Sequence, residues 1–283
     1  ILREALMKRT GFNHSVEWLE HSYKELCIPA KSDGGYRIDP NALHIWPRGG
    51  YMLIALPNLD GSFTVTLFLP NEGDPGFDSL DTPDHVRSFF HTRFPDAAAL
   101  IPDLEDAFFA NPTGPLGTVR SAPWHLGDQL CLLGDAAHAV VPFHGQGMNA
   151  AFEDCLEMDT CLEATEGDWA RSFELFFERR KPNADAIADM AIENYAEMRA
   201  SVIDPRFLLR KQLAFELERR QPDRLVPRYS MVMFRDDIAY AAAQSRGRIQ
   251  LEIMERAMKG KQRLEEIDID AVEREVLETL PPI

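Results

Sequence analysis

The chain has 283 residues and a hydrophobic content of 45%, enough to bury a substantial core in one large domain or two smaller ones. Its 46 acidic residues outnumber the 30 basic ones, so the formal net charge is −16. Because such a surface repels phosphate groups and no dense Lys/Arg run offsets it, nucleic acid and anionic membrane are disfavoured as partners.

The first residues are typical of the middle of an amphipathic helix. Residues 1–6 (Ile-Leu-Arg-Glu-Ala-Leu) have neither an initiator Met nor a helix-capping residue before them. We therefore expect the chain to begin partway through a domain.

The next part of the chain, to about residue 70, alternates apolar and polar residues with period two. This alternation predicts strands over 44–46, 51–56 and 63–69. Turn-forming residues separate these strands, so we predict an antiparallel meander. Side chains two residues apart share a face of a strand. Met52, Ile54 and Leu56 are therefore expected on one face of their strand, and Thr66 and Phe68 on one face of the next.

A loop over 71–82 separates the meander from two short predicted helices, 83–94 and 98–109. Another strand is expected near 117–124. It leads to residues 130–133 (Leu-Cys-Leu-Leu), a short apolar run typical of buried parallel strands.

After residue 147 the pattern is helical. Helices are predicted over 147–165, 168–200, 205–219, 236–258 and 268–279. Pro182 should end or kink the second of these near Lys181, because proline removes a backbone donor and clashes with the preceding turn. A β-rich first half followed by a helical second half indicates an α+β layout, or a larger α/β domain without its beginning.

The cysteines and the hydropathy exclude other classes of protein. Cys27, Cys131, Cys155 and Cys161 form no CxxC pair, and no histidine cluster has metal-ligand spacing, so we expect reduced thiols in a cytoplasmic protein and no metal site. No apolar run approaches the roughly 20 residues of a membrane span, and no signal peptide is evident.

The segment richest in chemistry is 132–149, where an apolar strand ends at a Gly-Asp step and a Gly-x-Gly precedes a helix. Asp135, at the end of the strand, can accept hydrogen bonds from the hydroxyls of a sugar or polyol. The helix that begins near Gly147 offers unpaired N–H groups and a positive dipole end. Its glycines allow a flat ring or an anion to approach the backbone closely.

Residues 134–138 (Gly-Asp-Ala-Ala-His), Pro142 and residues 145–149 (Gly-Gln-Gly-Met-Asn) together resemble the second flavin-binding motif of the class A flavoprotein aromatic hydroxylases. Most of that family has Pro directly after the motif's His, where this chain has Ala139. Further strings resemble the kynurenine 3-monooxygenases within that family. These strings are 40–47, 55–60, 62–68, 193–198 and 228–231, and the resemblance extends from about Tyr23 to Pro282.

The resemblance implies FAD as cofactor and NADPH as cosubstrate, with the flavin rather than an acid or base side chain carrying the chemistry. The implied cofactor-binding residues are Asp135, on the ribityl chain, and Pro142, Gly145, Gln146, Gly147, Met148 and Asn149, around the isoalloxazine ring.

The resemblance also implies a pocket for L-kynurenine. Asn194 and Tyr229 would bind its amino-acid end, although without the resemblance Asn194 would be taken as a solvent-facing residue. The implied wall around the aromatic ring consists of Leu43, Met52, Ile54, Leu56, Thr66 and Phe68, whose alternation alone predicts only an ordinary sheet core. Phe143, His144, Gln146, Glu197 and Met198 would complete the pocket. His144 is expected to position or pack rather than act as a base, because kynurenine already carries an activating amino group, and His138 is expected to be structural.

The expected fold is α/β, with an α+β appearance in this segment, as part of an FAD/NAD(P)-binding fold. Expected domains are 1–16 as a remnant of the FAD-binding domain, 17–125 as an antiparallel-sheet substrate domain, 126–166 as a return to the FAD-binding domain, and 167–283 as a helical C-terminal region. No G-x-G-x-x-G follows a strand, so the seat for the FAD pyrophosphate is missing and the chain alone is expected to be inactive.

The sequence leaves some questions open. A related flavin hydroxylase acting on another aromatic amino acid would have nearly the same pocket. A non-catalytic fragment without cofactor is a second alternative, which the intact Asp135 and the residues around Gly147 oppose. A homodimer stays open. The chain ends at residues 278–283 without the C-terminal membrane anchor of the mitochondrial members, so a soluble, bacterial-type protein is expected.

Overall fold

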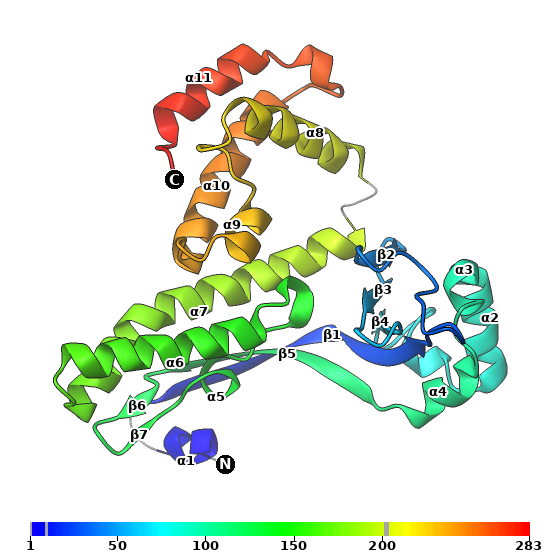
Figure 1. Ribbon diagram of the computed structural model, residues 1–283, viewed down its shortest axis with the longest axis horizontal. Coiled ribbons are helices and arrows are strands. Elements are labelled where there is room, and N and C mark those ends of the chain that lie inside the picture. The colour runs from blue at the N-terminus through cyan, green and yellow to red at the C-terminus, as the bar shows by residue number, and fades with distance from the viewer. Residues whose placement is uncertain (1, 9–10, 201–203) are drawn as a thin grey trace. The chain divides into compact units, whose positions relative to one another are not determined.

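The computed structural model describes residues 2–8, 11–200 and 204–283, so residues 1, 9 and 10 of the predicted N-terminal segment lie outside the described residues (Figure 1). The chain divides into two compact units. The loop unit, as we call it, consists of Ile1–Glu17, Thr118–Tyr195 and Asp204–Ile283. The sheet unit consists of Trp18–Gly117 and Ala196–Ile203. The domain boundaries inferred from the sequence stay a prediction.

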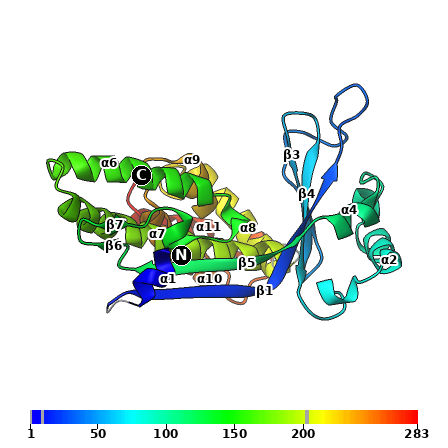
Figure 2. The same cartoon turned by 90° about the horizontal axis from the view of Figure 1, so that it is seen from below.

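A five-stranded sheet has the strand order β2-β3-β4-β1-β5. Its strands are β1 Asn13–Ile28, β2 His44–Pro47, β3 Met52–Pro57, β4 Phe63–Pro70 and β5 Thr113–Ala122. Strand β3 pairs antiparallel with both β2 and β4, which confirms the predicted meander. The register places Met52 opposite Phe68 and Ile54 opposite Thr66. Figure 2 shows β1 and β5 lying alongside each other, as the strand order requires.

One face of this sheet forms the core of the sheet unit. Leu53, Ala55, Val65, Leu67 and Leu69 point to this face and belong to a buried cluster with Phe90 and Phe94. The covering helices are α2 Pro83–Arg93, α3 Pro95–Ala98 and α4 Leu104–Ala110, preceded by the short 3-10 turn η1 Phe77–Ser79. The side chains at Met52, Ile54, Thr66 and Phe68 alternate with the core residues and therefore point to the opposite face.

The single helix predicted over 98–109 is wrong, because the structure has α3 and α4 there as separate elements. Asp103, at the start of α4, has a left-handed backbone with φ of 51°. A left-handed residue cannot continue a right-handed helix, so the pattern breaks at this point.

The apolar run at 130–133 is not a parallel strand among the described residues. Strand β7, Leu130–Cys131, pairs antiparallel with β6, His125–Leu126. The N–H of Leu132 donates to the carbonyl of Trp124 at 2.7 Å and extends this hairpin. An apolar run fixes burial but not strand direction, which explains the wrong prediction.

The rest of the loop unit is helical. Its helices are α1 Leu2–Met7, α5 Asp135–His138, α6 Gly147–Ala164, α7 Trp169–Ala200, α8 Pro205–Arg220, α9 Arg228–Phe234, α10 Tyr240–Ala257 and α11 Ile269–Thr279, with 3-10 turns η2 Pro142–His144 and η4 Leu264–Glu266. Helices α6 and α7 lie side by side (Figure 1). The helix predicted over 236–258 begins only at Tyr240, because residues 235–239 form the turn that follows α9.

Helix α7 continues through Pro182, so it does not end near Lys181, and the kink that was the other predicted outcome stays a prediction. Proline cannot donate to the carbonyl one turn earlier and disturbs the bonds beside it. Next to Pro182, the side chain of Asn183 adds a bond inside the helix, because its Nδ2 donates to the carbonyl of Arg179 at 3.1 Å. The other end of this amide, Oδ1, accepts from the N–H of Ala241 at 3.0 Å and ties α7 to α10.

No described helix is both long enough and apolar enough to cross a membrane.

Candidate functional site

The segment from Gly134 to Asn149, here called the 134–149 loop, connects the β6–β7 hairpin to helix α6. It contains the one-turn helix α5, the 3-10 turn η2 and the left-handed Gly145, with φ of 65°. Gly134 has φ of 54° and ψ of −141°, a conformation that only glycine adopts readily. A Cβ at Gly134 would also lie 3.1 Å from the Cβ of Ala151 on α6. Glycine at position 134 is therefore required by both backbone conformation and close packing.

A buried acid on α6, Asp154, lies directly under the start of this loop. Its Oδ2 accepts from the N–H of Gly134 at 2.9 Å and lies 2.6 Å from Nε2 of His138. Its Oδ1 accepts from Nε of Arg180 on α7 at 2.8 Å. Burial alone would raise the pKa of the Asp154 carboxyl, but the bonds from His138, Gly134 and Arg180 hold that pKa below its ordinary value. The carboxylate is therefore a charged, fully bonded junction of three elements.

The first turn of α6 is open to a ligand. Gln146 precedes the helix but makes no capping hydrogen bond, since its amide contacts Sδ of Met233 at 2.9 Å and Nδ2 of Asn149 at 2.9 Å. The first backbone N–H bonded within this turn is that of Ala150, which donates to the Gln146 carbonyl at 2.8 Å. The preceding N–H groups and the positive end of an 18-residue helix are thus available for negative charge.

Asp135 and the loop glycines complete a surface that fits a flavin nucleotide. The carboxylate of Asp135 is exposed and makes no hydrogen bond or ion pair with the residues that the structure describes. A Cβ at Gly147 would meet only Val140, at 3.7 Å, and one at Gly145 would meet nothing within 4 Å, so the backbone there is approachable. Pro142 and Met148 are exposed beside it. A free acid that accepts hydroxyls and an uncapped helix start suit the polyol and the electron-rich ring edge of FAD.

Asn194 is directed at the 134–149 loop rather than at solvent. Its Nδ2 donates to the carbonyl of Phe143 at 2.6 Å. One residue along α7, the ring of Tyr195 stacks on that of Phe143 with centroids 4.2 Å apart. Two consecutive α7 residues therefore fix the position of Phe143, which gives a mid-helix asparagine a structural reason.

His144 is stacked on Tyr229 of α9, with ring centroids 5.5 Å apart. Neither ring nitrogen of His144 has a hydrogen-bond partner within the described parts of the chain. Burial and the neighbouring Arg228 guanidinium lower the pKa of His144 to about 4. The imidazole is therefore neutral at pH 7 and unpaired, which agrees with packing and gives no sign of a catalytic base held by a partner.

This low pKa predicts an acid-dependent loss of stability. In the unfolded chain His144 takes up a proton as the pH falls through about 6.5, whereas in the fold it does so only near 4. The contribution of the neutral His144 to the free energy of unfolding is therefore complete above pH 6.5. It is lost progressively between pH 6.5 and 4, and the total loss is about 3 kcal/mol. We expect urea unfolding to show the wild type losing more stability than His144→Phe between pH 7 and 4.5. Parallel losses in the two proteins would contradict this prediction.

The residues expected to surround the aromatic ring of the substrate lie in the sheet unit. Met52, Thr66 and Phe68 are buried and adjacent on β3 and β4, and Ile54 lies between them, half-buried. Leu43 and Leu56 are exposed by 45% and 43%. Glu197 and Met198 are half-buried on the last part of α7. The structure brings Met52, Ile54, Thr66 and Phe68 onto one face, and it separately brings Phe143, His144, Asn194 and Tyr229 together.

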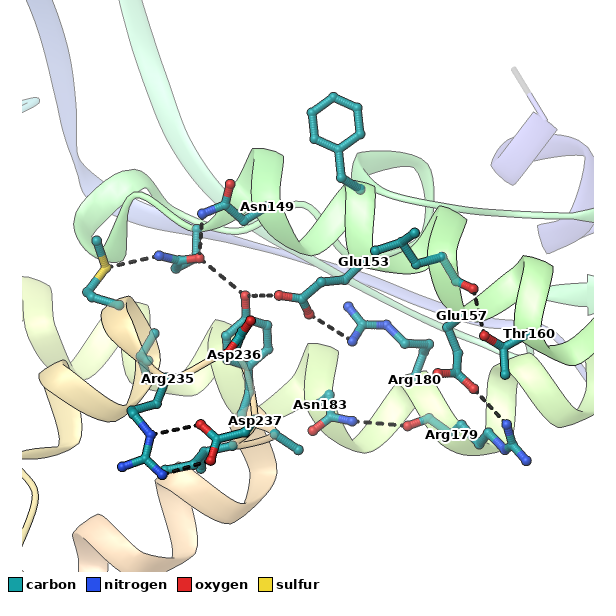
Figure 3. Close-up of a pocket in the computed structure, with 18 residues that line it drawn as sticks. Asn149, Glu153, Glu157, Thr160, Arg179, Arg180, Asn183, Arg235, Asp236 and Asp237 are labelled. Atoms are coloured by element: carbon teal, nitrogen blue, oxygen red, sulfur yellow. Dashed lines mark hydrogen bonds and ion pairs between the residues drawn. The ribbon is translucent and has the colours of Figure 1, made fainter. Parts of the chain in front are cut away.

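A pocket of about 610 Å³ opens in the loop unit beside α6, α7 and the α9–α10 connection (Figure 3). Gln146 and Asn149 are among the residues that line it. Its basic groups are already paired, as Figure 3 shows. The pairs are Arg179 with Glu157 at 2.9 Å, Arg180 with Glu153 at 3.0 Å, and Arg235 with Asp237 at 2.7 Å. Each arginine in this lining therefore already has a carboxylate partner, and none is left to bind an anionic ligand.

The sequence reasoning missed Asp154, Arg180 and Tyr240. The hydroxyl of Tyr240 on α10 lies 2.7 Å from Glu153 and 3.2 Å from Gln146, so it ties α10 to the start of α6. A signal for Asp154 existed, because the buried residues of α6 are Ala150, Asp154, Met158 and Cys161. That spacing places an acid on the apolar stripe of the helix, where a charge requires partners.

Comparisons with known proteins agree with this description. The family described as "FAD binding domain" matches residues 102–191. A kynurenine 3-monooxygenase of Myxococcus xanthus (strain DK1622) is 50% identical over 281 residues, covering 99% of this chain and 60% of the relative. The enzyme of the same name from Xanthomonas axonopodis pv. citri (strain 306) is 49% identical over 282 residues, which cover 100% of this chain and 62% of that relative. The chain thus spans about three fifths of the length of these curated relatives.

Among solved structures, a tetrameric form of 2-methyl-3-hydroxypyridine-5-carboxylic acid oxygenase is similar with a TM-score of 0.52. The two are 17% identical, and the match covers 70% of this chain and 53% of that one. This likeness concerns the fold alone. With the family match, it confirms the predicted fold class of a mixed α/β, FAD-binding architecture.

Proposed function

Since this chain is a homologue of the kynurenine 3-monooxygenases over nearly its whole length, as its resemblance predicted, we propose that it serves an FAD-dependent monooxygenase that converts L-kynurenine to 3-hydroxy-L-kynurenine with NADPH and O₂. The observation that carries the proposal is the joint presence of 50% identity to such an enzyme and a 134–149 loop with an uncapped helix start and a free acid. Hydroxylation of another aromatic amino acid and a cofactor-less fragment are less favoured by these relatives.

In this proposal the loop unit holds the cofactor. Asp135 would accept hydrogen bonds from the ribityl hydroxyls, and the first N–H groups of α6, from Gly147 to Asn149, would face the ring edge that gains negative charge. Pro142, Gly145, Gln146 and Met148 would border the ring. When bound, FAD supplies electron transfer from NADPH and the activation of oxygen.

The substrate side of the proposal uses neutral groups. Asn194 and the half-exposed Tyr229 would hydrogen-bond the amino-acid end of L-kynurenine. Phe143 and His144, with Gln146, Glu197 and Met198, would close the pocket, and Leu43, Met52, Ile54, Leu56, Thr66 and Phe68 would surround the aromatic ring. The substrate's own amino group activates the ring. The low pKa of His144 therefore agrees with a packing role in which no side chain has to remove a proton.

We also propose that the protein works in the cytoplasm, because its four cysteines are free thiols, as expected in a reducing compartment. Self-association to a homodimer stays an expectation that light scattering of the purified protein would test.

The direct test uses the natural protein that contains this chain, purified and examined for flavin by its visible absorption. L-Kynurenine and NADPH are added, and 3-hydroxykynurenine is followed by mass spectrometry. We expect product to form in step with NADPH loss. Bound flavin without product would refute L-kynurenine as the substrate and favour another aromatic amino acid. A protein without flavin would refute the proposed function.

A further inference from the structure

Helix α5 is held at both ends by one side chain. The N–H of Gly134, immediately before the helix, donates to Oδ2 of Asp154 at 2.9 Å. Nε2 of His138, the last residue of the helix, lies 2.6 Å from the same oxygen. A helix of four residues has too few internal hydrogen bonds to hold itself. Bonds from outside the helix must therefore hold it. Arg3 donates to the carbonyls of Asp135 and Ala136 at 3.2 and 3.4 Å, and the Ser121 hydroxyl donates to the carbonyl of Ala137 at 2.7 Å. The two bonds to Asp154 differ from these because they join both ends of the helix to one buried group.

The clamping carboxylate is itself fixed. Asp154 is fully buried, and its other oxygen accepts from Nε of Arg180 at 2.8 Å. The same guanidinium donates to Glu153 at 3.0 Å and to the carbonyl of Ala150 at 3.1 Å, so it spans from α7 to two turns of α6. The ring of His138 is also confined, because Trp124 lies 5.0 Å away between centroids. The 134–149 loop, α6 and α7 thus meet at one carboxylate, whose orientation is fixed by hydrogen bonds to both of its oxygens.

We propose that Asp154 is a positioning residue for the flavin. By clamping the two ends of α5, Asp154 sets the direction of the Asp135 carboxylate. This inference rests on the proposed function, because it assumes that Asp135 contacts FAD. Asp135 is the first residue of α5 and follows the clamped Gly134 directly. A carboxylate that is exposed and without partners in the described residues would otherwise sample many directions, and preorganisation by a supporting group lowers the cost of binding.

The competing role for Asp154 is that of a counter-charge for Arg180. The two roles differ in their response to Asp154→Asn. With its oxygen in the place of Oδ2, the amide can still accept from the Gly134 N–H and from an Nε2–H of His138, but it carries no charge and turns its NH2 group toward Nε of Arg180. A clamp therefore tolerates asparagine, whereas a counter-charge does not, because the buried Arg180 would lose its buried anion and keep the partly exposed Glu153.

The test measures the dissociation constant of FAD by flavin fluorescence, in the natural protein that contains this chain, alongside thermal unfolding of the flavin-free forms. We expect Asp154→Ala to weaken FAD binding about 20-fold, by analogy with partners that orient metal ligands. Asp154→Asn should stay within about threefold of wild type. The matched control is Glu157→Ala, since Glu157 pairs with Arg179 across the same two helices without touching the loop.

A second variant keeps the inference testable if Asp154→Ala fails to fold. His138→Leu removes one of the two anchors, leaves the Asp154–Arg180 pair intact, and should weaken FAD binding about fivefold. Equal FAD affinity in His138→Leu and wild type, or equal losses in Asp154→Ala and Asp154→Asn, would overturn the clamp. A wild-type protein that binds no FAD would instead refute the proposed function, so the two failures are distinguishable.

Discussion

Asp135→Ala is expected to weaken FAD binding about 100-fold while leaving the fold intact. The carboxylate can accept one or two charge-assisted hydrogen bonds from ribityl hydroxyls, each contributing about 1.5–3 kcal/mol. The carboxylate is exposed and makes no hydrogen bond or ion pair with the described residues, and the bond from Arg3 goes to the backbone carbonyl, which alanine keeps. Its loss should therefore change the free energy of unfolding by less than about 0.5 kcal/mol. Fluorescence titration with FAD and urea unfolding measure the two quantities on the same preparation.

The matched control for this variant is Asp128→Ala. Asp128 is an exposed acid in the turn between β6 and β7, so its replacement changes the net charge equally but lies outside the 134–149 loop. FAD affinity should be unchanged there. An Asp135→Ala protein that binds FAD within threefold of wild type would remove Asp135 from the cofactor site.

The parts of the fold that the sequence predicted well are those where one local pattern decides the structure. The period-two alternation of β3 and β4 places Met52, Ile54, Thr66 and Phe68 on the face opposite the core, and the structure has that register. Helix α6 begins at Gly147, as the Gly-x-Gly pattern predicted. In each case the neighbouring residues carry all of the required information.

The parts that were missed depend on contacts that the local pattern does not specify. The direction of β7 depends on its pairing with β6. Asp154 has partners 20, 16 and 26 residues away, at Gly134, His138 and Arg180. No local pattern gives such a junction. The only hint is an acid at a buried helical position, which indicates that partners exist without naming them.

Asn194 was predicted in part. The sequence predicted it as a site residue, but it did not predict the residue that its side chain contacts. The resemblance implied a bond to the substrate, and the structure adds a bond from Nδ2 to the carbonyl of Phe143 at 2.6 Å. An asparagine that both holds the loop and faces the substrate would link substrate binding to the geometry around the flavin. Such a residue should affect the coupling of NADPH oxidation to hydroxylation, beyond its effect on KM.

Asn194→Asp is therefore expected to lower kcat/KM for L-kynurenine about 100-fold, or about 3 kcal/mol. The carboxylate cannot donate to the Phe143 carbonyl, and it would repel the carboxylate of the substrate. Tyr229→Phe is the contrasting variant, because it removes a hydroxyl but keeps the ring stacked on His144, and it should raise KM about tenfold with coupling unchanged. Comparing product formed with NADPH consumed separates the two. If Asn194→Asp raised KM alone, with product still formed in step with NADPH, the bond to Phe143 would have no part in coupling, and Asn194 would act on the substrate only.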